Sequence, residues 1–347
     1  MKKKILWIIL IVIVVAGLVA AWIFLGPATG FKGKKEYLYI STKAATKEAV
    51  MDSLEKKNII TNSGAFNFLA GRMGYWDKIK PGKYEINKGD GLLEIVRRLR
   101  NGVQSPVNLV ITKIRTKEDL ARMVGSRFEC DSAEMIAFLN SPDSLRKYGN
   151  NSETALWSVL PDTYTYHWNT TPRKIYQKLY DEAEKFWTQE RKSKAEKLGL
   201  TPLQAHVIAS IIEEETNYHE EKDTMASVYI NRYRRNMPLG ADPTIKFALK
   251  NFSLKWIGGD MLNVASPYNT YRNTGLPPGP ICTPSRRTIE AVLSAPQTDY
   301  LFFVANSNFS GSHLFSVTFE EHMAKARAFQ QEDKRRRELK NNQNNTR

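Results

Sequence analysis

The stretch EYLYISTKAATKEAVMDSLEKKNII, residues 36–60, decides the class of fold. EYLYIS has the alternating pattern of a β-strand, whereas TKEAVMDSLEKKNII carries apolar residues at helical spacing behind Thr46, a residue type that caps helices. The sequence that follows predicts a second helix over about 62–73, a strand at PGKYEI and a third helix in DGLLEIVRRLRNG that ends at Gly102. The order strand, helix, helix, strand, helix predicts a small α+β module.

A larger α+β domain is predicted beyond this module. The alternating apolar residues of PVNLVIT predict a strand. Several segments with helical spacing and two more strands follow it along the chain. The expected elements are helices near 116–124, 132–140, 171–198 and 221–236, a helix that ends in three glutamates, a helix in SRRTIEAVLSA, and strands at YLFFVAN and HLFSVT. A Pro- and Gly-rich loop region is expected over 237–285, and the polar, charged tail 333–347 is expected to be disordered.

The stretch LPDTYTYHWNTTP, residues 160–172, is rich in aromatic and turn residues. It is interpreted either as a loop or wall over a cleft, or as a source of ordinary core aromatics in Tyr164, Tyr166 and Trp168.

The N-terminus predicts a membrane anchor. MKKK is followed by 21 residues without a charge, Ile5 to Leu25, before Gly26 and Pro27. At about 1.5 Å per residue this run forms roughly 31 Å of helix, enough to cross a bilayer. A cleaved signal has a shorter apolar region, although Val19 to Ala21 could imitate a cleavage site, so cleavage remains an alternative. The lysines are expected to stay in the cytoplasm, which sends the body of the chain across the membrane.

Charge and cysteine content narrow the class of partner. The net charge of +15 predicts attraction to polyanions. A body beyond the membrane argues against nucleic acid and leaves an anionic membrane surface or an acidic polysaccharide. Cys130 and Cys282 are the only cysteines, so neither a disulfide framework nor a thiolate metal cluster is expected. They are interpreted as buried free thiols, with one bridge between them as the alternative.

The stretch ASIIEEETNYHEE, residues 209–221, places three glutamates at the end of an apolar helical run. On a helical wheel with 100° per residue and Val207 at zero, the apolar stripe is centred at about 70°. Glu215 falls at about 80°, within this stripe. Glu214 falls at the margin of the stripe and Glu213 on the opposite face, and both are expected to be solvated. Glu215 is either paired with an arginine or kept protonated by apolar surroundings, in which case it can donate a proton. Cleavage of a glycosidic bond needs such an acid.

Other kinds of site have less support. Glu215 and His219 lie one turn apart, but H-E-x-x-H is absent and the chain has only five histidines, so no metal site is predicted. G-x-S-x-G is absent as well, which argues against a serine nucleophile. No cofactor is expected.

Several motifs together carry a resemblance to a known family. They are ASIIEEET, MASVYINR (225–232), DPT (242–244), SPYNTYRNTGLPPGPI (266–281) and YLFFVAN (300–306). Over about residues 37–330 the chain resembles the endolytic murein transglycosylase family, also called MltG or YceG-like. The resemblance implies the following organisation: a cytoplasmic tail 1–4, a transmembrane helix 5–25, a linker 26–36, a LysM-like module 37–105, a YceG-like catalytic domain 106–332 and the tail 333–347.

The resemblance implies an inner-membrane enzyme whose periplasmic domain cuts nascent peptidoglycan strands between N-acetylmuramic acid and N-acetylglucosamine. The family's essential glutamate precedes the Thr of its Glu-Lys-Glu-Thr motif, and this position is Glu215. As an acid it protonates the glycosidic oxygen; as a base it takes the proton of the muramic C6 hydroxyl, which closes a 1,6-anhydro ring. Here Glu214 replaces the motif's Lys, and Gly240 and Ala241 replace the Gln and Ser that are common before DPT.

Substrate-binding residues are implied in two loops: Asp242 and Thr244 in DPT, and Tyr268, Asn269 and Tyr271 in YNTY. Asp242 is either a turn or capping residue before Pro243, or it orients Glu215 or the sugar. The YNTY residues either form aromatic walls and an amide that binds acetamido groups, or they fix their loop.

Two other functions are weighed against the lyase. One is a membrane-anchored scaffold that holds peptidoglycan, or recruits peptidoglycan synthases, without cutting it. The other is a lysozyme-like hydrolase, which needs a second carboxylate or a base that holds water, with Asp242 as the candidate.

Overall fold

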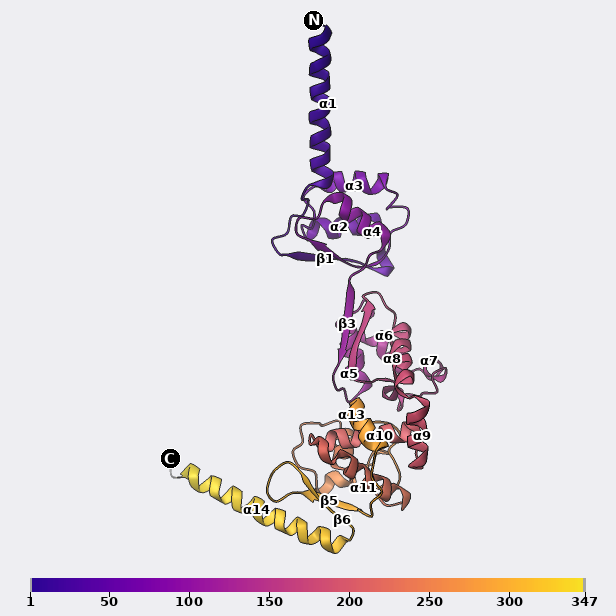
Figure 1. Ribbon diagram of the computed structural model, residues 1–347, viewed down its shortest axis with the longest axis vertical. Coiled ribbons are helices and arrows are strands. Elements are labelled where there is room, and N and C mark those ends of the chain that lie inside the picture. Colours follow the sequence, from indigo (N-terminus) through magenta and orange to yellow (C-terminus); the bar gives the residue numbers. More distant parts are fainter. Residues whose placement is uncertain (1, 346–347) are drawn as a thin grey trace. The chain divides into compact units, whose positions relative to one another are not determined.

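The computed structural model of the protein describes residues 2–345. It mixes helices with short strands, which confirms the predicted α+β class and the apolar N-terminal helix (Figure 1). The chain divides into two compact units. The first comprises Met1–Leu109, Met123–Ser132 and Thr165–Pro172, and the second comprises Val110–Arg122, Ala133–Tyr164 and Arg173–Arg347.

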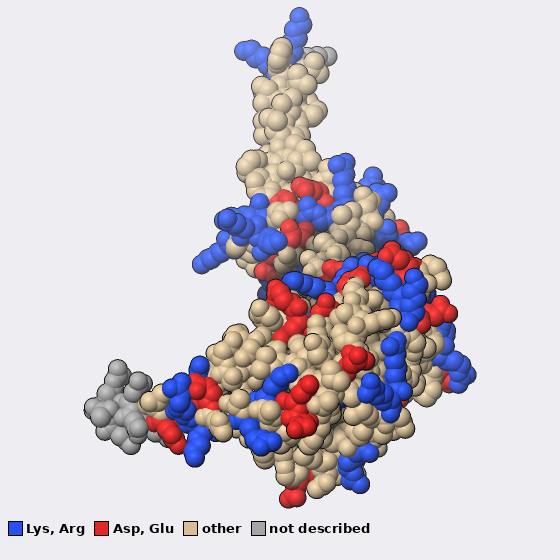
Figure 2. All heavy atoms as spheres, turned by 60° about the horizontal axis from the view of Figure 1, so that its bottom comes forward, with Lys and Arg blue, Asp and Glu red and all other residues tan. Residues whose placement is uncertain are grey.

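Helix α1 (Lys2–Leu25) is long and apolar enough to cross a membrane over Lys3–Leu25, and none of this span is buried against the protein. Figure 2 shows its side as free of charged side chains between the lysines at its tip and the module at its foot. By length and composition α1 therefore fits a single-pass membrane anchor.

The module follows the predicted order of elements. Its elements are β1 (Lys35–Ile40), α2 (Lys47–Lys56), α3 (Ser63–Arg72), β2 (Gly82–Asn87) and α4 (Leu92–Asn101). The two strands pair antiparallel, from Lys35 opposite Asn87 to Ile40 opposite Gly82. Thr46 caps α2, and α4 ends at Gly102 with a left-handed φ of 73°. Every element contributes to one buried core, through residues such as Leu38, Leu54, Phe66, Tyr84 and Ile95.

The segment 26–36, expected to be a linker, is held against the module. Ala28 is buried, its N–H donates to the Asp90 carbonyl, and its own carbonyl accepts from the Thr61 N–H at 2.8 Å. The sequence suggested a linker because glycine and lysine are common in flexible segments, but these backbone hydrogen bonds fix it in place.

The middle of the chain differs from the prediction at three points, one of which is an additional short helix over residues 142–146. Its elements are β3 (Pro106–Ile111), α5 (Lys117–Gly125), α6 (Ser132–Asn140), α7 (Pro142–Arg146), β4 (Asp162–His167), α8 (Pro172–Phe186) and α9 (Gln189–Lys197). The aromatic stretch forms β4, which pairs with β3, and its buried Tyr164 and Tyr166 favour the core interpretation. The helix expected over 171–198 is two helices, because Thr188 caps the start of α9.

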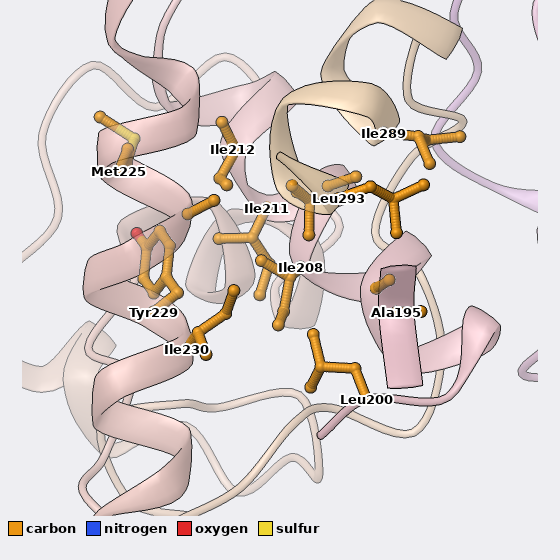
Figure 3. Close-up of a cluster of buried hydrophobic side chains, with 14 of the residues drawn as sticks. Ala195, Leu200, Ile208, Ile211, Ile212, Met225, Tyr229, Ile230, Ile289 and Leu293 are labelled. Carbon is orange, nitrogen blue, oxygen red and sulfur yellow. The ribbon is translucent and has the colours of Figure 1, made fainter. Parts of the chain in front are cut away.

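The second unit is built around α10 (Pro202–Glu215). This helix is buried from Ala205 to Ile212 and packs against α11 (Lys222–Arg234) and α13 (Arg286–Leu293). Figure 3 shows the isoleucines of α10 between Tyr229 of α11 on one side and Leu293 of α13 on the other. A helix surrounded in this way holds the residue at its end in a fixed position.

The loop region 237–285 contains a short helix that was not expected from the sequence, α12 (Asp242–Ala248). Short 3-10 turns occur at Thr42–Ala44, Ala155–Ser158, His219–Glu221 and Gly259–Asn263. The two strands expected near the C-terminus are confirmed as β5 (Phe302–Ala305) and β6 (His313–Ser316), which pair antiparallel. Cys130 and Cys282 are both buried, and no disulfide joins them, in line with the expectation of two buried thiols.

The tail expected to be disordered is helical as far as the structure describes it. Helix α14 (Phe319–Asn345) runs through most of it, and residues 346–347 lie outside the described part of the chain. Glu332 pairs with Arg335 at 2.7 Å and with Arg336 at 2.9 Å, and Asp333 pairs with Arg337 at 2.6 Å. Such pairs one turn apart favour a helix, whereas net composition alone suggested disorder.

Candidate active site

Glu215 is the last residue of α10, and Thr216 turns the backbone out of the helix. The residue is partly exposed, but its Oε2 atom is fully buried and accepts no hydrogen bond. Among residues 2–345, no ion pair or hydrogen bond of its carboxyl group is found, so the arginine alternative is not seen. Burial, and then the charge of Asp242, raise the pKa of Glu215 to about 7. Near neutral pH the group can therefore both donate and accept a proton.

The other two glutamates are not solvated, contrary to the prediction. Arg115 donates to Glu214 through Nε at 3.1 Å and Nη2 at 2.8 Å, and Lys113 Nζ lies 3.0 Å away. Glu213 pairs with Lys222 Nζ at 2.9 Å. Their side chains are only 13% and 16% exposed, respectively. The helical wheel gave the direction of each side chain but not the basic partners that pack there.

Asp242 and Tyr271 come together beside Glu215. The Tyr271 hydroxyl donates to Asp242 Oδ1 at 2.6 Å. Ala241, rather than Asp242, occupies the capping position of α12, and no side-chain cap is formed there. Burial first, and then the hydrogen bond to Asp242, raise the pKa of Tyr271, which keeps its phenol protonated. This placement favours the interpretation of Asp242 as a residue that acts on Glu215.

Thr244 and Asn269 are both fully buried. Thr244 Oγ1 donates to the Ala241 carbonyl at 2.7 Å. The Asn269 amide donates to two carbonyls of its own loop at 2.9 Å, and its Oδ1 accepts from the Tyr271 N–H at 3.0 Å. These hydrogen bonds fix the loops that carry Asp242 and Tyr271, which is the alternative that the sequence left open for Asn269; substrate contact by Thr244 and Asn269 stays a prediction.

Tyr268 lies at a cavity of the second unit. Its ring packs 4.6 Å from that of Phe247 on α12. Both rings line a cavity of about 170 Å³ together with three basic side chains, those of Arg115, Lys117 and Lys250. Glu215 does not line this cavity, but α12 carries residues of both places, since Asp242 is at its start and Phe247 near its end.

Two residues of α11 belong to the site and were not singled out from the sequence. Arg232 donates to the Leu239 carbonyl through Nη1 at 2.6 Å, which holds the segment before Asp242, and its charge favours ionised Glu215. Tyr229 has a buried hydroxyl that finds no hydrogen-bond partner in the described part of the chain, and its pKa is raised by burial and then by the Glu215 charge. Both lie in MASVYINR, so the motif was the available signal.

The structure gives a reason for glycine at position 240, where the family commonly has Gln. Its φ is +59°, and a Cβ there would lie 3.3 Å from Arg232 Nη1 and 3.7 Å from the Tyr271 ring. A side chain at this position would crowd Arg232 and Tyr271 and strain the backbone, and glycine avoids both effects.

Comparisons with known proteins agree with these motifs. A family model described as the YceG-like family matches residues 38–328. An endolytic murein transglycosylase of Bacillus subtilis is 29% identical over 289 residues, which cover 79% of each chain. An endolytic murein transglycosylase of Streptococcus pneumoniae is 27% identical over 323 residues, which cover 83% of this chain and 57% of the relative. The crystal structure of a YceG-like protein from Listeria monocytogenes superposes with a TM-score of 0.55 at 26% identity, covering 84% of this chain and 98% of that one.

Proposed function

The chain belongs to the YceG-like family, and on that premise we propose that it is a peptidoglycan lytic transglycosylase that cuts glycan strands internally. The observation that carries this proposal is the carboxyl group of Glu215: its Oε2 atom is buried without a hydrogen-bond partner among the described residues, and its pKa is raised to about 7. It occupies the motif position from which the family's essential glutamate acts.

One carboxyl group of this kind suffices for the proposed reaction. Protonated Glu215 gives its proton to the oxygen between N-acetylmuramic acid and N-acetylglucosamine as that bond breaks. The resulting carboxylate takes the proton of the muramic C6 hydroxyl, whose oxygen bonds to C1 and closes the 1,6-anhydro ring. Asp242 supplies the negative charge that disfavours ionised Glu215, and Tyr271 holds Asp242 in place. Among the residues first expected to bind substrate, Tyr268 and Tyr271 retain that role in the proposal.

We place the body of the chain on the periplasmic side of the inner membrane. Three lysines precede the apolar span of α1, and basic residues favour the cytoplasmic side. The strand, helix, helix, strand order of the module supports a LysM-like role in holding glycan. The proposed partners are peptidoglycan strands, the membrane and, through the family resemblance, peptidoglycan synthases.

The nature of the new sugar end tests the proposal. The purified full chain in detergent is incubated with isolated glycan strands, and the products are analysed by mass spectrometry. Shortened strands that arise from internal cuts and carry 1,6-anhydro-N-acetylmuramic acid at the new end support the lyase. Reducing ends would indicate a hydrolase, and strands that bind without being cut would indicate the scaffold.

Asp242→Asn is expected to move the pH dependence of cleavage to lower pH. The wild-type rate falls as the pH rises through about 7, because the acid form of Glu215 is lost. Removing the Asp242 charge lowers the pKa of Glu215, so the acid form disappears at lower pH and the rate at pH 8 falls more than the rate at pH 6. The measurement is the cleavage rate across this range.

Tyr271→Phe is the matched control, because it removes the hydrogen bond but keeps the Asp242 charge, so no shift to lower pH is expected. An unchanged profile in Asp242→Asn would contradict this role.

A further inference from the structure

The two tryptophans of α1 mark its position in the membrane. Trp7 and Trp22 are 66% and 71% exposed. They are separated by about 22 Å of helix, and tryptophan concentrates at the two interfaces of a bilayer. Trp22 therefore sets the level of the interface on the side of the module. Phe24 and Leu25, which follow it, lie at the same level or just outside it.

The module is fastened to this end of α1. The Phe24 and Phe68 rings lie 6.3 Å apart. A Cβ at Gly91 would approach the Leu25 carbonyl oxygen to 2.8 Å, so the start of α4 touches the helix end directly. Because Phe24 lies at the interface, the part of α3 that carries Phe68 lies at the interface too. Figure 1 shows α3 running across the foot of α1.

One face of α3 is exposed at this level. Phe66 and Ala70 point into the module core, whereas Gly64, Phe68 and Arg72 are exposed at four-residue intervals along the other side. Phe68 is 61% exposed, and α3 contains no aspartate or glutamate. An exposed phenylalanine with an arginine beside it and no acidic residue suits the headgroup layer of a membrane.

We propose that this face of α3 docks on the surface of the membrane that α1 spans. Phe68 inserts among the lipid headgroups, and Arg72 meets lipid phosphates. The backbone contacts of residues 26–30 then hold the module flat on the membrane instead of letting it turn about a flexible tether. The docking depends on α1 spanning a bilayer and not on the chemistry of Glu215.

Fluorescent labels at single cysteines test this proposal. Both native cysteines are buried, so a cysteine at an exposed position reacts selectively. Phe68→Cys is labelled with an environment-sensitive dye in the full chain, which is reconstituted into vesicles of phosphatidylethanolamine and phosphatidylglycerol. Val103→Cys is the matched control, because Val103 is 60% exposed but follows Gly102, beyond the end of α4 that is farther along the chain from α1. The label at 68 is expected to be quenched by nitroxide lipids and protected from iodide, and the label at 103 is expected to behave in the opposite way.

Gly64→Cys separates lipid contact from simple packing against Phe24. A Cβ at Gly64 meets only the Asn62 side chain, at 3.6 Å, so the variant is expected to fold. Docking predicts that a label at 64 follows the label at 68. If the label at 64 is quenched by iodide as strongly as the label at 103, or if all three positions respond alike, the docking is overturned.

Discussion

Glu215→Gln is expected to reduce glycan cleavage by at least about 100-fold, the usual effect of removing a general acid and base. The amide keeps the shape of the side chain but cannot give up a proton as an acid. The fold is expected to survive, because the Glu215 carboxyl makes no ion pair or hydrogen bond within the described residues. Cleavage is measured from anhydro ends by mass spectrometry, and folding by thermal unfolding.

We also expect Glu215→Gln to change how the stability of the protein depends on pH. Folding raises the pKa of Glu215 from 4.5 to about 7, so the folded chain holds a proton that the unfolded chain releases. The contribution of Glu215 to the free energy of unfolding is fully present below about pH 4.5. It is lost as the pH rises to about 7 and does not change at higher pH. Glu215→Gln removes this loss, so the variant is expected to be the more stable protein at pH 8.

Glu214→Gln is the matched control for this experiment. It makes the same chemical change one residue away, at a carboxylate bound to Arg115 and Lys113. We expect it to lose stability, because Arg115 keeps only part of its pairing, and to retain cleavage. Equal loss of cleavage in both variants would argue that the helix end, rather than one carboxyl group, is required. Full activity of Glu215→Gln would exclude the proposed acid.

The local elements were predictable because their signals are local. Thr46 and Gly102 mark the ends of helices in the module through their own side-chain and backbone chemistry. Glu215 was predictable for a related reason, since the angle between residues on one helix depends only on their spacing. Helix α12 was hidden by Pro243 in its first turn, where proline is in fact tolerated.

Partners distant in sequence explain what the sequence did not reveal. The surroundings of Glu213 come from Lys222 and Thr288, and those of Glu214 from Arg115, and no periodicity in α10 contains this information. Asn269 illustrates a second limit. A residue in a specific motif can be required by its loop as much as by a substrate, and only its burial shows which applies.

Lys222→Met is expected to destabilise the protein by about 3–5 kcal/mol, the usual cost of removing one partner of a buried ion pair. The Lys222 side chain is 3% exposed and donates to Glu213 at 2.9 Å and to Thr288 at 2.8 Å. Without it the Glu213 carboxylate stays buried between α10, α11 and α13 with its charge uncompensated. The free energy of unfolding from urea titration measures the effect. Lys334→Met, which removes a lysine that is 80% exposed and 4.0 Å from Glu338, is the matched control and is expected to change stability little.

The pH dependence of this loss distinguishes a missing charge from a packing defect. Burial alone would raise the pKa of Glu213, but hydrogen bonds from Thr288 and Lys222 outweigh it and lower that pKa. The stability that this carboxylate contributes is therefore present above the ordinary glutamate pKa of 4.5 and is lost as the pH falls through the lowered value. The difference between wild type and Lys222→Met should narrow in acid, where Glu213 becomes neutral in the variant, and Glu213→Leu added to Lys222→Met should recover much of the loss at pH 7. A difference that stays constant with pH and is not recovered in the double variant would mean that the lysine acts through its packing alone.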